Sequence, residues 1–435
     1  MPKGGVANRA IKALNVLPGQ HKLGKGKRFK FLTFQDLINR VDVSRDVYRD
    51  TTTKLQLAPA DGAESFFQQY LAEWSELDLT ADFKTFANEV YPLSQSLAQL
   101  LHYRKRVVRS LLGQLRQPRC TCSLALLDLV AHLARDLRDE FWPFFPDAVR
   151  AITLVLDAPP ADEGPTADAE LFAAAFRALA FLFKYLLRQL LGEPSAVLPL
   201  YRPLLGHERE HVRNFAAESL AFLVRKIAQR QSQPEDDEGG QLNSTMRAMF
   251  AFCTPPEPEP ENAEGAEATE GDGPWEALQG GVAATLFESV KGVGNRLHSN
   301  AEQMLSLLFE HIQPPPPEAQ DPASAAALQC RRAVVKDVLH RLCQHVRAET
   351  AERVWDALHA EVEAAASSWH EIGGEPEEQR LELSVQALAE WSRARLARTR
   401  VRRDDKQDAE GDGKEEEAGQ RPQKKKRKLL KPTTV

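Results

Sequence analysis

The chain has 435 residues, of which 43% are hydrophobic and 27% are charged, and this composition excludes collagen-like and wholly disordered proteins. The formal net charge of −6 averages over segments of opposite sign, so by itself it identifies no binding partner. The five cysteines stand in no framework pattern, which is typical of proteins from a reducing compartment.

Residues 1–30 are basic and dotted with glycine. They carry eight Lys or Arg residues, no acid and no apolar stretch, so we expect a flexible arm and no secretory signal peptide. The most apolar stretch of the chain, residues 171–191, is interrupted by three cations that would be costly in a bilayer. That stretch therefore predicts a helix buried in the protein.

Apolar residues recur at helical spacing from about Ser65 onward, and no segment convincingly predicts a strand. Residues 66–74 and 97–112 form two such sets. Residues 124–137 predict an amphipathic helix that ends at the Phe141–Pro146 breaker, and a second helix follows over 148–156. Together they predict a helical hairpin with proline in its turn.

Residues 211–227 give the clearest repeat signal. Six apolar residues fall near one helical face: Val212, Phe215, Ala216, Leu220, Leu223 and Ile227. Small residues beside them permit close helix approach, and a Val-Arg start followed by Ala and Leu at these offsets is typical of the second helix of a HEAT repeat. We expect an Asp at Phe215 or Leu220 to cost much more stability than a change of Arg225.

Helix pairs that cannot bury their apolar faces alone must stack on neighbours, so the sequence predicts an all-α, HEAT/armadillo-like α-solenoid. Composition interrupts it, because residues 254–274 are acidic and proline-rich and predict a disordered insertion. Later helices are expected over 275–290, 300–312, 323–346, 348–369 and 377–402. The predicted organisation is a basic arm (1–30), a solenoid (31–253), the insertion (254–274), a continued solenoid (275–402) and an acidic-then-basic tail (403–435).

His207, Glu208 and His211 match the His-Glu-x-x-His pattern, in which two histidines bind zinc and the glutamate activates water. A zinc metallopeptidase is therefore an alternative function. However, charged residues stand between the histidines where such a helix is usually apolar, and His211 opens the next predicted helix. We favour a solvated turn between helices.

Other patterns favour structural roles, so no metal, cofactor, membrane or small-molecule substrate is expected. Residues 19–26 spell most of a phosphate-binding loop but lack its Ser or Thr and a preceding strand. The pair Cys120 and Cys122 has no partner pair with zinc-site spacing. A helix would spread the cluster of His340, Cys343 and His345 over its surface. Aromatic residues in the Phe141–Pro146 breaker are more consistent with packing between helices than with a binding surface.

Two basic clusters are the functional candidates. The arm carries Lys22, Lys25, Lys27, Arg28 and Lys30 among glycines, a mobile cation chain that could follow an RNA phosphate backbone; the alternative is an ordinary solvated terminus. The tail carries Lys424, Lys425, Lys426, Arg427 and Lys428, a pentamer of the nuclear-localisation type; the alternative is a tail that only balances charge.

Several segments resemble, in matching order, the amino-terminal region of one protein family. It is the family of the twentieth U three protein, also called Down-regulated in metastasis. The segments are Arg28–Phe34, Leu126–Val130, Leu133–Leu137, Phe144–Pro146, Arg213–Ser219, Phe222–Lys226, Lys291–Val293 and Leu297–Ser299. Members are several times longer than this chain. The resemblance implies a non-catalytic HEAT-repeat scaffold of the small-subunit processome (the 90S pre-ribosome), which contacts pre-ribosomal RNA and other processome proteins in the nucleolus. A HEAT-type nuclear transport adaptor is a further alternative.

Overall fold

The computed structural model describes most of the chain between residues 31 and 396. The described ranges are 31–41, 65–118, 120–158, 165–231, 240–253, 273–313, 322–346 and 348–372, followed by 374, 378, 380–393 and 395–396. The predicted insertion, apart from its last two residues, lies outside these ranges. So do the predicted arm and tail.

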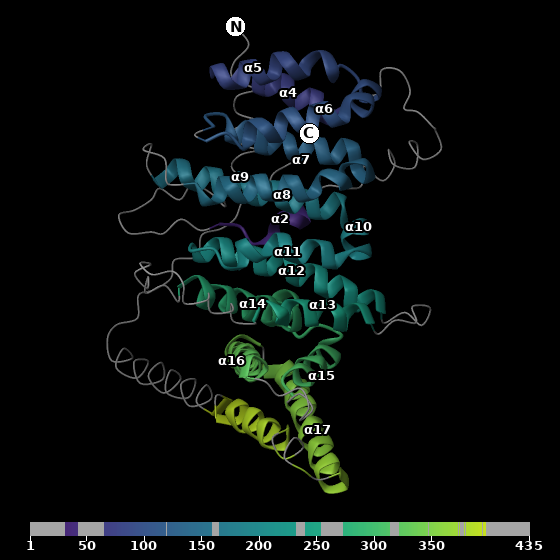
Figure 1. The fold of residues 1–435 in the computed structure, drawn as a ribbon, viewed down its shortest axis with the longest axis vertical. Coiled ribbons are helices and arrows are strands. Elements are labelled where there is room, and N and C mark those ends of the chain that lie inside the picture. Colours follow the sequence, from purple (N-terminus) through teal and green to yellow (C-terminus); the bar gives the residue numbers. More distant parts are fainter. Residues whose placement is uncertain are drawn as a thin grey trace, which may run out of the picture.

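The described residues form helices and no strand, which confirms the predicted all-α class (Figure 1). The α-helices are α2 (Phe34–Arg40), α4 (Phe66–Leu77), α5 (Ala81–Val90), α6 (Leu97–Leu115), α7 (Ser123–Leu137), α8 (Phe145–Asp157), α9 (Pro165–Tyr185), α10 (Leu187–Gly192), α11 (Pro194–Leu205), α12 (Glu210–Gln231), α13 (Gly240–Ala251), α14 (Gly273–Lys291), α15 (Ala301–His311), α16 (Pro322–His345) and α17 (Ala348–Ile372). Three short 3₁₀ turns, η1 (Tyr91–Leu93), η2 (Arg138–Phe144) and η3 (Val293–Asn295), join some of them. Residues 380–393 are also helical.

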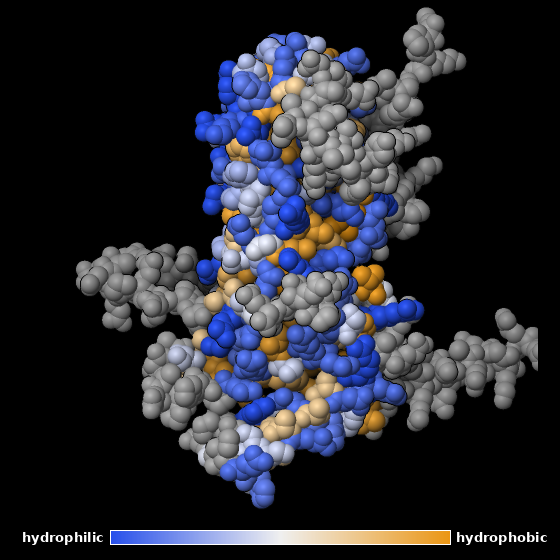
Figure 2. Space-filling model, turned by 90° about the vertical axis from the view of Figure 1, so that its right-hand side faces the viewer, coloured by the Kyte–Doolittle hydropathy of each residue, from blue (hydrophilic) through white to orange (hydrophobic). Residues whose placement is uncertain are grey.

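The helices stack in two layers along the long axis of the molecule, as an α-solenoid requires (Figure 1). One layer runs α4, α7, α9, α12, α14 and α16, and the other runs α6, α8, α11, α13 and α15; each helix packs on the next of its layer, except that α9 and α12 touch only lightly. A continuous hydrophobic core lies between the layers. Hydrophilic residues cover most of one side of this stack, with apolar patches between them (Figure 2).

Helix α2 departs from chain order. It packs on both α9 and α12, and Figure 1 shows it at mid-height between these helices although it precedes α4 in the sequence. Phe34, at the start of α2, is fully buried and its ring meets those of Phe183, Phe215 and Phe222 at centroid distances of 5.4 to 5.6 Å. An N-terminal segment thus fills the gap between α9 and α12 in one layer.

Local sequence signals explain where many helices begin. The side chains of Thr33, Ser65, Thr80 and Ser96 accept backbone hydrogen bonds at the starts of α2, α4, α5 and α6. The predicted hairpin over 124–156 is present as α7 and α8. Its breaker is the 3₁₀ turn η2, and Pro146 lies in the first turn of α8, where its missing N–H is tolerated.

Helix α12 confirms the helix predicted over 211–227, and all six predicted apolar residues on it are buried. Arg225, the comparison residue for the Phe215 and Leu220 substitutions, is itself buried: it is 8% exposed, and its guanidinium donates a 2.6 Å hydrogen bond to the backbone carbonyl of Glu288 in α14. Helix α14 itself begins at Gly273, so the last two residues of the predicted insertion are helical.

Close contact between the layers depends on glycine at one point. A Cβ at Gly281 of α14 would lie 2.3 Å from the carbonyl oxygen of Leu205 at the end of α11. A Cβ at the adjacent Gly280 would meet nothing within 4 Å. Of these two neighbouring glycines, Gly281 is therefore the one that the packing requires. Within the described residues, no helix is long and apolar enough to cross a membrane.

Candidate functional site

The two predicted basic clusters, Lys22 to Lys30 and Lys424 to Lys428, lie outside the described residues. What the structure places is the point where the arm joins the folded body. The described chain starts at Phe31, directly after the arm, and enters α2 at Phe34. The arm is therefore connected to the middle of the solenoid, between α9 and α12, rather than to the end formed by α4 and α5 (Figure 1).

Aromatic contacts hold this junction. The Phe31 ring stacks on the imidazole of His211 at a centroid distance of 4.6 Å and at an interplanar angle of 17°. It also makes edge contacts with Phe172 and Phe176 of α9, at 6.2 and 5.5 Å. Such pairs add about 0.5–1.5 kcal/mol each beyond the area they bury. Phe31 therefore ties the start of the described chain to both α9 and α12.

Glu218 of α12 completes the junction. Its carboxylate accepts a 2.7 Å hydrogen bond from the backbone N–H of Phe34. Burial raises the pKa of Glu218 to about 7; Glu288 also raises it, while the Phe34 N–H, Lys291 and Arg225 act in the opposite direction. Lys291 pairs with Glu288 at 2.6 Å, so the α12–α14 side of the junction carries a compact charge network.

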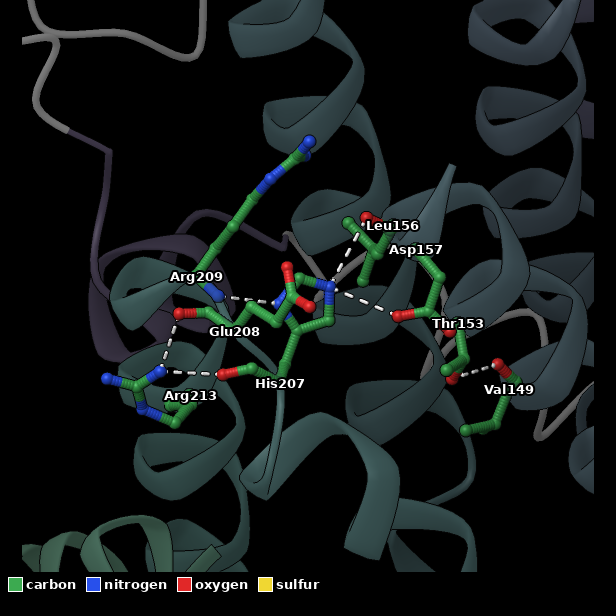
Figure 3. Close-up of polar contacts among 8 residues, drawn as sticks. All are labelled: Val149, Thr153, Leu156, Asp157, His207, Glu208, Arg209 and Arg213. Atoms are coloured by element: carbon green, nitrogen blue, oxygen red, sulfur yellow. Dashed lines mark hydrogen bonds and ion pairs between the residues drawn. The ribbon is translucent and has the colours of Figure 1, made fainter. Parts of the chain in front are cut away.

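His207 and Glu208 of the His-Glu-x-x-His pattern lie in the turn between α11 and α12 (Figure 3), whereas His211 lies in the first turn of α12. His207 is buried, and its Nδ1 accepts a 3.0 Å hydrogen bond from the backbone N–H of Arg209. Its Nε2 lies 3.3 Å from the carbonyl oxygen of Leu156 and 3.1 Å from a carboxylate oxygen of Asp157. Arg213 donates to the backbone carbonyls of His207 and Glu208 at 2.6 and 2.8 Å. Both ring nitrogens of His207 therefore have partners: Nδ1 bonds within the turn itself, and Nε2 fixes the turn to the end of α8.

His211 has a different environment. Its ring lies between Phe31 and Phe172, and burial, together with nearby Arg209, lowers its pKa. Glu208 is exposed. Among the described residues no group of three or more His, Cys, Asp or Glu side chains could hold a metal ion. The contacts of the two histidines are those of a turn and an aromatic junction. They support the turn interpretation, but the turn is not solvated as predicted, because His207 is buried against the end of α8.

The remaining sequence candidates are also placed. The sulfurs of Cys120 and Cys122 lie 3.6 Å apart before α7, and the hydrogen bond between them lowers the pKa of Cys120. His340 and His345 of α16 do not converge, because His340 bonds Gln344 whereas the ring of His345 lies 5.7 Å from that of Phe287. In the η2 breaker, Trp142 stacks on Phe145 at 5.3 Å, as expected for packing between helices.

Two buried acids of α7 went unrecognised in the sequence. Asp128 accepts a 2.9 Å hydrogen bond from Trp74 Nε1 and pairs with Arg177; burial opposes its ionisation, but Arg177 and His132 outweigh it and its pKa is lowered. Asp136 accepts hydrogen bonds from Ser65 Oγ and from the N–H groups of Phe66 and Phe67, at 2.7, 3.2 and 2.8 Å. It caps α4 from another helix, and this long-range role has no local sequence signal.

The solvent face of α6 also went unrecognised, because only the apolar residues of 97–112 entered the helix prediction. That face carries exposed cations, and a helical projection of the same residues would have shown them on one side. Helix α6 contains no acidic residue.

No known protein-family profile matches the chain. Two curated proteins are similar to it, both described as "U3 small nucleolar RNA-associated protein 20". The Saccharomyces cerevisiae protein is 29% identical over 284 residues, which is 65% of this chain and 10% of that protein. The Schizosaccharomyces pombe protein is 28% identical over 204 residues, or 46% of this chain and 8% of that protein. The resemblance found in the sequence segments is thereby confirmed, and the matched part of this chain spans about a tenth of its relatives' length.

Proposed function

We propose that this chain is a non-catalytic scaffold of the small-subunit processome, with a role in nucleolar pre-rRNA processing and in biogenesis of the small ribosomal subunit. The observation that carries this proposal is the similarity over 65% of the chain to a yeast protein named for its association with U3 small nucleolar RNA. Nuclear and nucleolar localisation, with import through Lys424 to Lys428, is part of the proposal.

The α-solenoid supports a scaffold role. Each repeat contacts only its neighbours, so a stack of repeats presents a long surface relative to its mass, on which several partners can bind. The proposed partners are pre-ribosomal RNA and other proteins of the processome. Chemistry is not required for such a role.

The basic arm is the proposed first RNA contact. Lys22, Lys25, Lys27, Arg28 and Lys30 supply five cations within nine residues, with little besides Phe29 to contact a base. Phe31 and Phe34 come directly after the arm and are held between α9 and α12. The arm would therefore act from the middle of the solenoid. RNA bound there would lie within reach of both halves of the stack.

The alternatives lack support from the described contacts. A zinc peptidase acting through His207, Glu208 and His211 would need both histidines to turn from their present partners toward one ion. A nuclear transport adaptor would share the fold class, and no contact or surface described above favours it.

The proposal is tested by capturing an epitope-tagged chain from cells and quantifying the RNA bound to it. We expect enrichment of U3 small nucleolar RNA over a small nucleolar RNA of unrelated function, measured against a tag-only control. Equal recovery of both RNAs would overturn the proposal. Stoichiometric zinc in the purified protein, lost in His211→Ala, would favour the peptidase instead. Recovery of transport factors without pre-ribosomal components would favour the adaptor.

A further inference from the structure

Helix α6 has an unusually uniform charge. It contains Arg104, Lys105, Arg106 and Arg109 and no acidic residue. Its buried face is apolar and carries Leu100, Val107, Val108, Leu111 and other residues of the core. The side toward solvent is therefore defined almost entirely by polar and basic residues.

The cations of this region fall into two groups. At the flanks, Arg104 pairs with Glu140 and Arg116 pairs with Asp147, each at 3.0 Å. Between them Lys105, Arg106 and Arg109 are exposed and make no ion pair within the described residues. An acid does lie nearby, since Glu89 of α5 accepts a 2.8 Å hydrogen bond from Ser110, but Ser110 and not a cation is its partner. Three charges are thus left available to an external anion.

These residues share one helical face. His102, Lys105, Arg106, Arg109, Gly113 and Arg116 follow one another at spacings of three, one, three, four and three residues, and all are exposed. From His102 to Arg116 the face extends about 21 Å, at 1.5 Å per residue. At Gly113 a Cβ would meet nothing within 4 Å, so an elongated partner could approach the backbone there.

The chemistry of the face favours a phosphate backbone over a protein. Stable protein interfaces have a core of apolar and aromatic residues, and none of the exposed large hydrophobic residues within the described ranges lies on α6. Binding to a phosphate backbone needs only cations in a suitable array, because its affinity comes from counterion release.

We infer that the solvent face of α6, through Lys105, Arg106 and Arg109, is a second RNA-binding surface that contacts the phosphate backbone without reading sequence. This inference rests on the proposed function, because it identifies RNA as the partner of this face. The basic arm joins the body between α9 and α12, so the two cation groups are distinct and one RNA could engage both.

The test measures binding of a fluorescent 20-nucleotide polyuridine RNA by anisotropy at several salt concentrations. The full chain is compared with a triple variant in which Lys105, Arg106 and Arg109 become Ala. At about 0.7 in the salt exponent per single-strand phosphate, removing the cations that bind three phosphates reduces the slope by about 2. The fall in affinity between 50 and 200 mM salt is then roughly 20-fold smaller than in the parent.

A distributed control removes the same charge elsewhere. In this control variant Ala replaces Arg188, Arg247 and Arg296 together. All three are exposed and lie in separate segments. A gain-of-function variant, Gly113→Lys, adds a cation to the open position and is expected to steepen the slope by about 0.7. Because the substituted Lys and Arg positions are exposed, the circular dichroism spectrum and the denaturant midpoint of the two triple variants should stay at parental values, which excludes misfolding as a cause. Gly113→Lys replaces a helical glycine with a better helix former, so its midpoint should be equal to or above that of the parent.

The inference is overturned if the triple variant keeps the parental slope, or if the distributed control loses as much as the triple variant. Tighter binding to poly-glutamate than to RNA at equal charge would also overturn it, in favour of an acidic protein. The proposed function fails separately, through loss of U3 RNA enrichment in cells. A combined variant carries the three α6 substitutions and also has the five cations of the arm replaced by Ala. If the two surfaces act independently, its salt exponent should be smaller by about 2 than that of the variant with the arm substitutions alone.

Discussion

The backbone N–H of Phe34 donates a 2.7 Å hydrogen bond to the carboxylate of Glu218, and this bond joins residues 184 positions apart. It fixes α2 against α12, where the ring of Phe34 also enters an aromatic cluster. Because α9 and α12 touch each other only lightly, the N-terminal segment acts as part of the solenoid and adds contacts between these two helices.

The first prediction concerns Glu218 and pH. Its pKa is raised from 4.5 to about 7 in the folded protein, mainly by burial. Between these two values the folded state holds a proton that the unfolded chain has lost, so this group makes stability fall as pH rises from 4.5 to 7. Glu218→Gln keeps an oxygen that can accept the Phe34 N–H and does not titrate. We expect it to raise the denaturant midpoint at pH 8 and to have little effect at pH 5.

Other groups titrate in the same experiment; for example, burial lowers the pKa of His298 to about 4. The informative quantity is therefore the difference between the parent and Glu218→Gln at each pH. A difference that does not change between pH 5 and pH 8 would contradict the buried, protonated state of Glu218.

The second prediction tests the insertion of α2. Phe34→Ala removes a fully buried ring from the cluster with Phe183 and Phe215, and such truncations cost about 3–5 kcal/mol. Asn39→Ala on the exposed side of the same helix should change stability by no more than about 0.5 kcal/mol. Urea unfolding followed by circular dichroism measures both. Equal midpoints for the two variants would mean that α2 does not pack between α9 and α12.

The third prediction uses neighbouring glycines of α14. Gly281→Ala places a methyl group 2.3 Å from the Leu205 carbonyl oxygen, so either α11 or α14 must shift and the denaturant midpoint should fall. Gly280→Ala meets open space and replaces glycine with a better helix former, which should stabilise by about 0.5–1 kcal/mol. Stabilisation by both substitutions would show that α11 and α14 do not approach as described.

The fourth prediction concerns the arm. Replacing Lys22, Lys25, Lys27, Arg28 and Lys30 with Ala should weaken RNA binding and lower its salt exponent by about 0.7 for each phosphate that the arm no longer binds. The folded body should be unaffected, as judged by an unchanged unfolding midpoint. If this variant keeps the parental affinity and salt slope, the arm is an inert terminus.

Helical periodicity was enough to predict the solenoid and the course of α7, α8 and α12, because each buries one face at regular spacing. It could not predict the place of α2. The segment Phe31–Phe34 has the composition of a short apolar anchor, but its partners on α9 and α12 lie about 140 or more residues away, and nothing local identifies them.

Buried charges were the other feature that the sequence did not predict. Nothing in the sequence indicates that the long side chain of Arg225 is buried and reaches the Glu288 carbonyl between α12 and α14. Lys226 is more exposed and is the better comparison for Phe215→Asp or Leu220→Asp. For the candidate site, the sequence alone suggested the basic arm, but the junction at Phe31 and Phe34 that follows it depends on the tertiary contacts of His211 and Glu218.

The central claim, that this chain is a processome scaffold, is tested most directly by sedimenting a cell extract through a gradient and locating the tagged chain. We predict that it travels with the large particles that contain U3 small nucleolar RNA. After ribonuclease treatment it should move to the top of the gradient. A chain that sediments as free protein in the untreated extract, while U3 RNA remains in the large particles, would contradict the account.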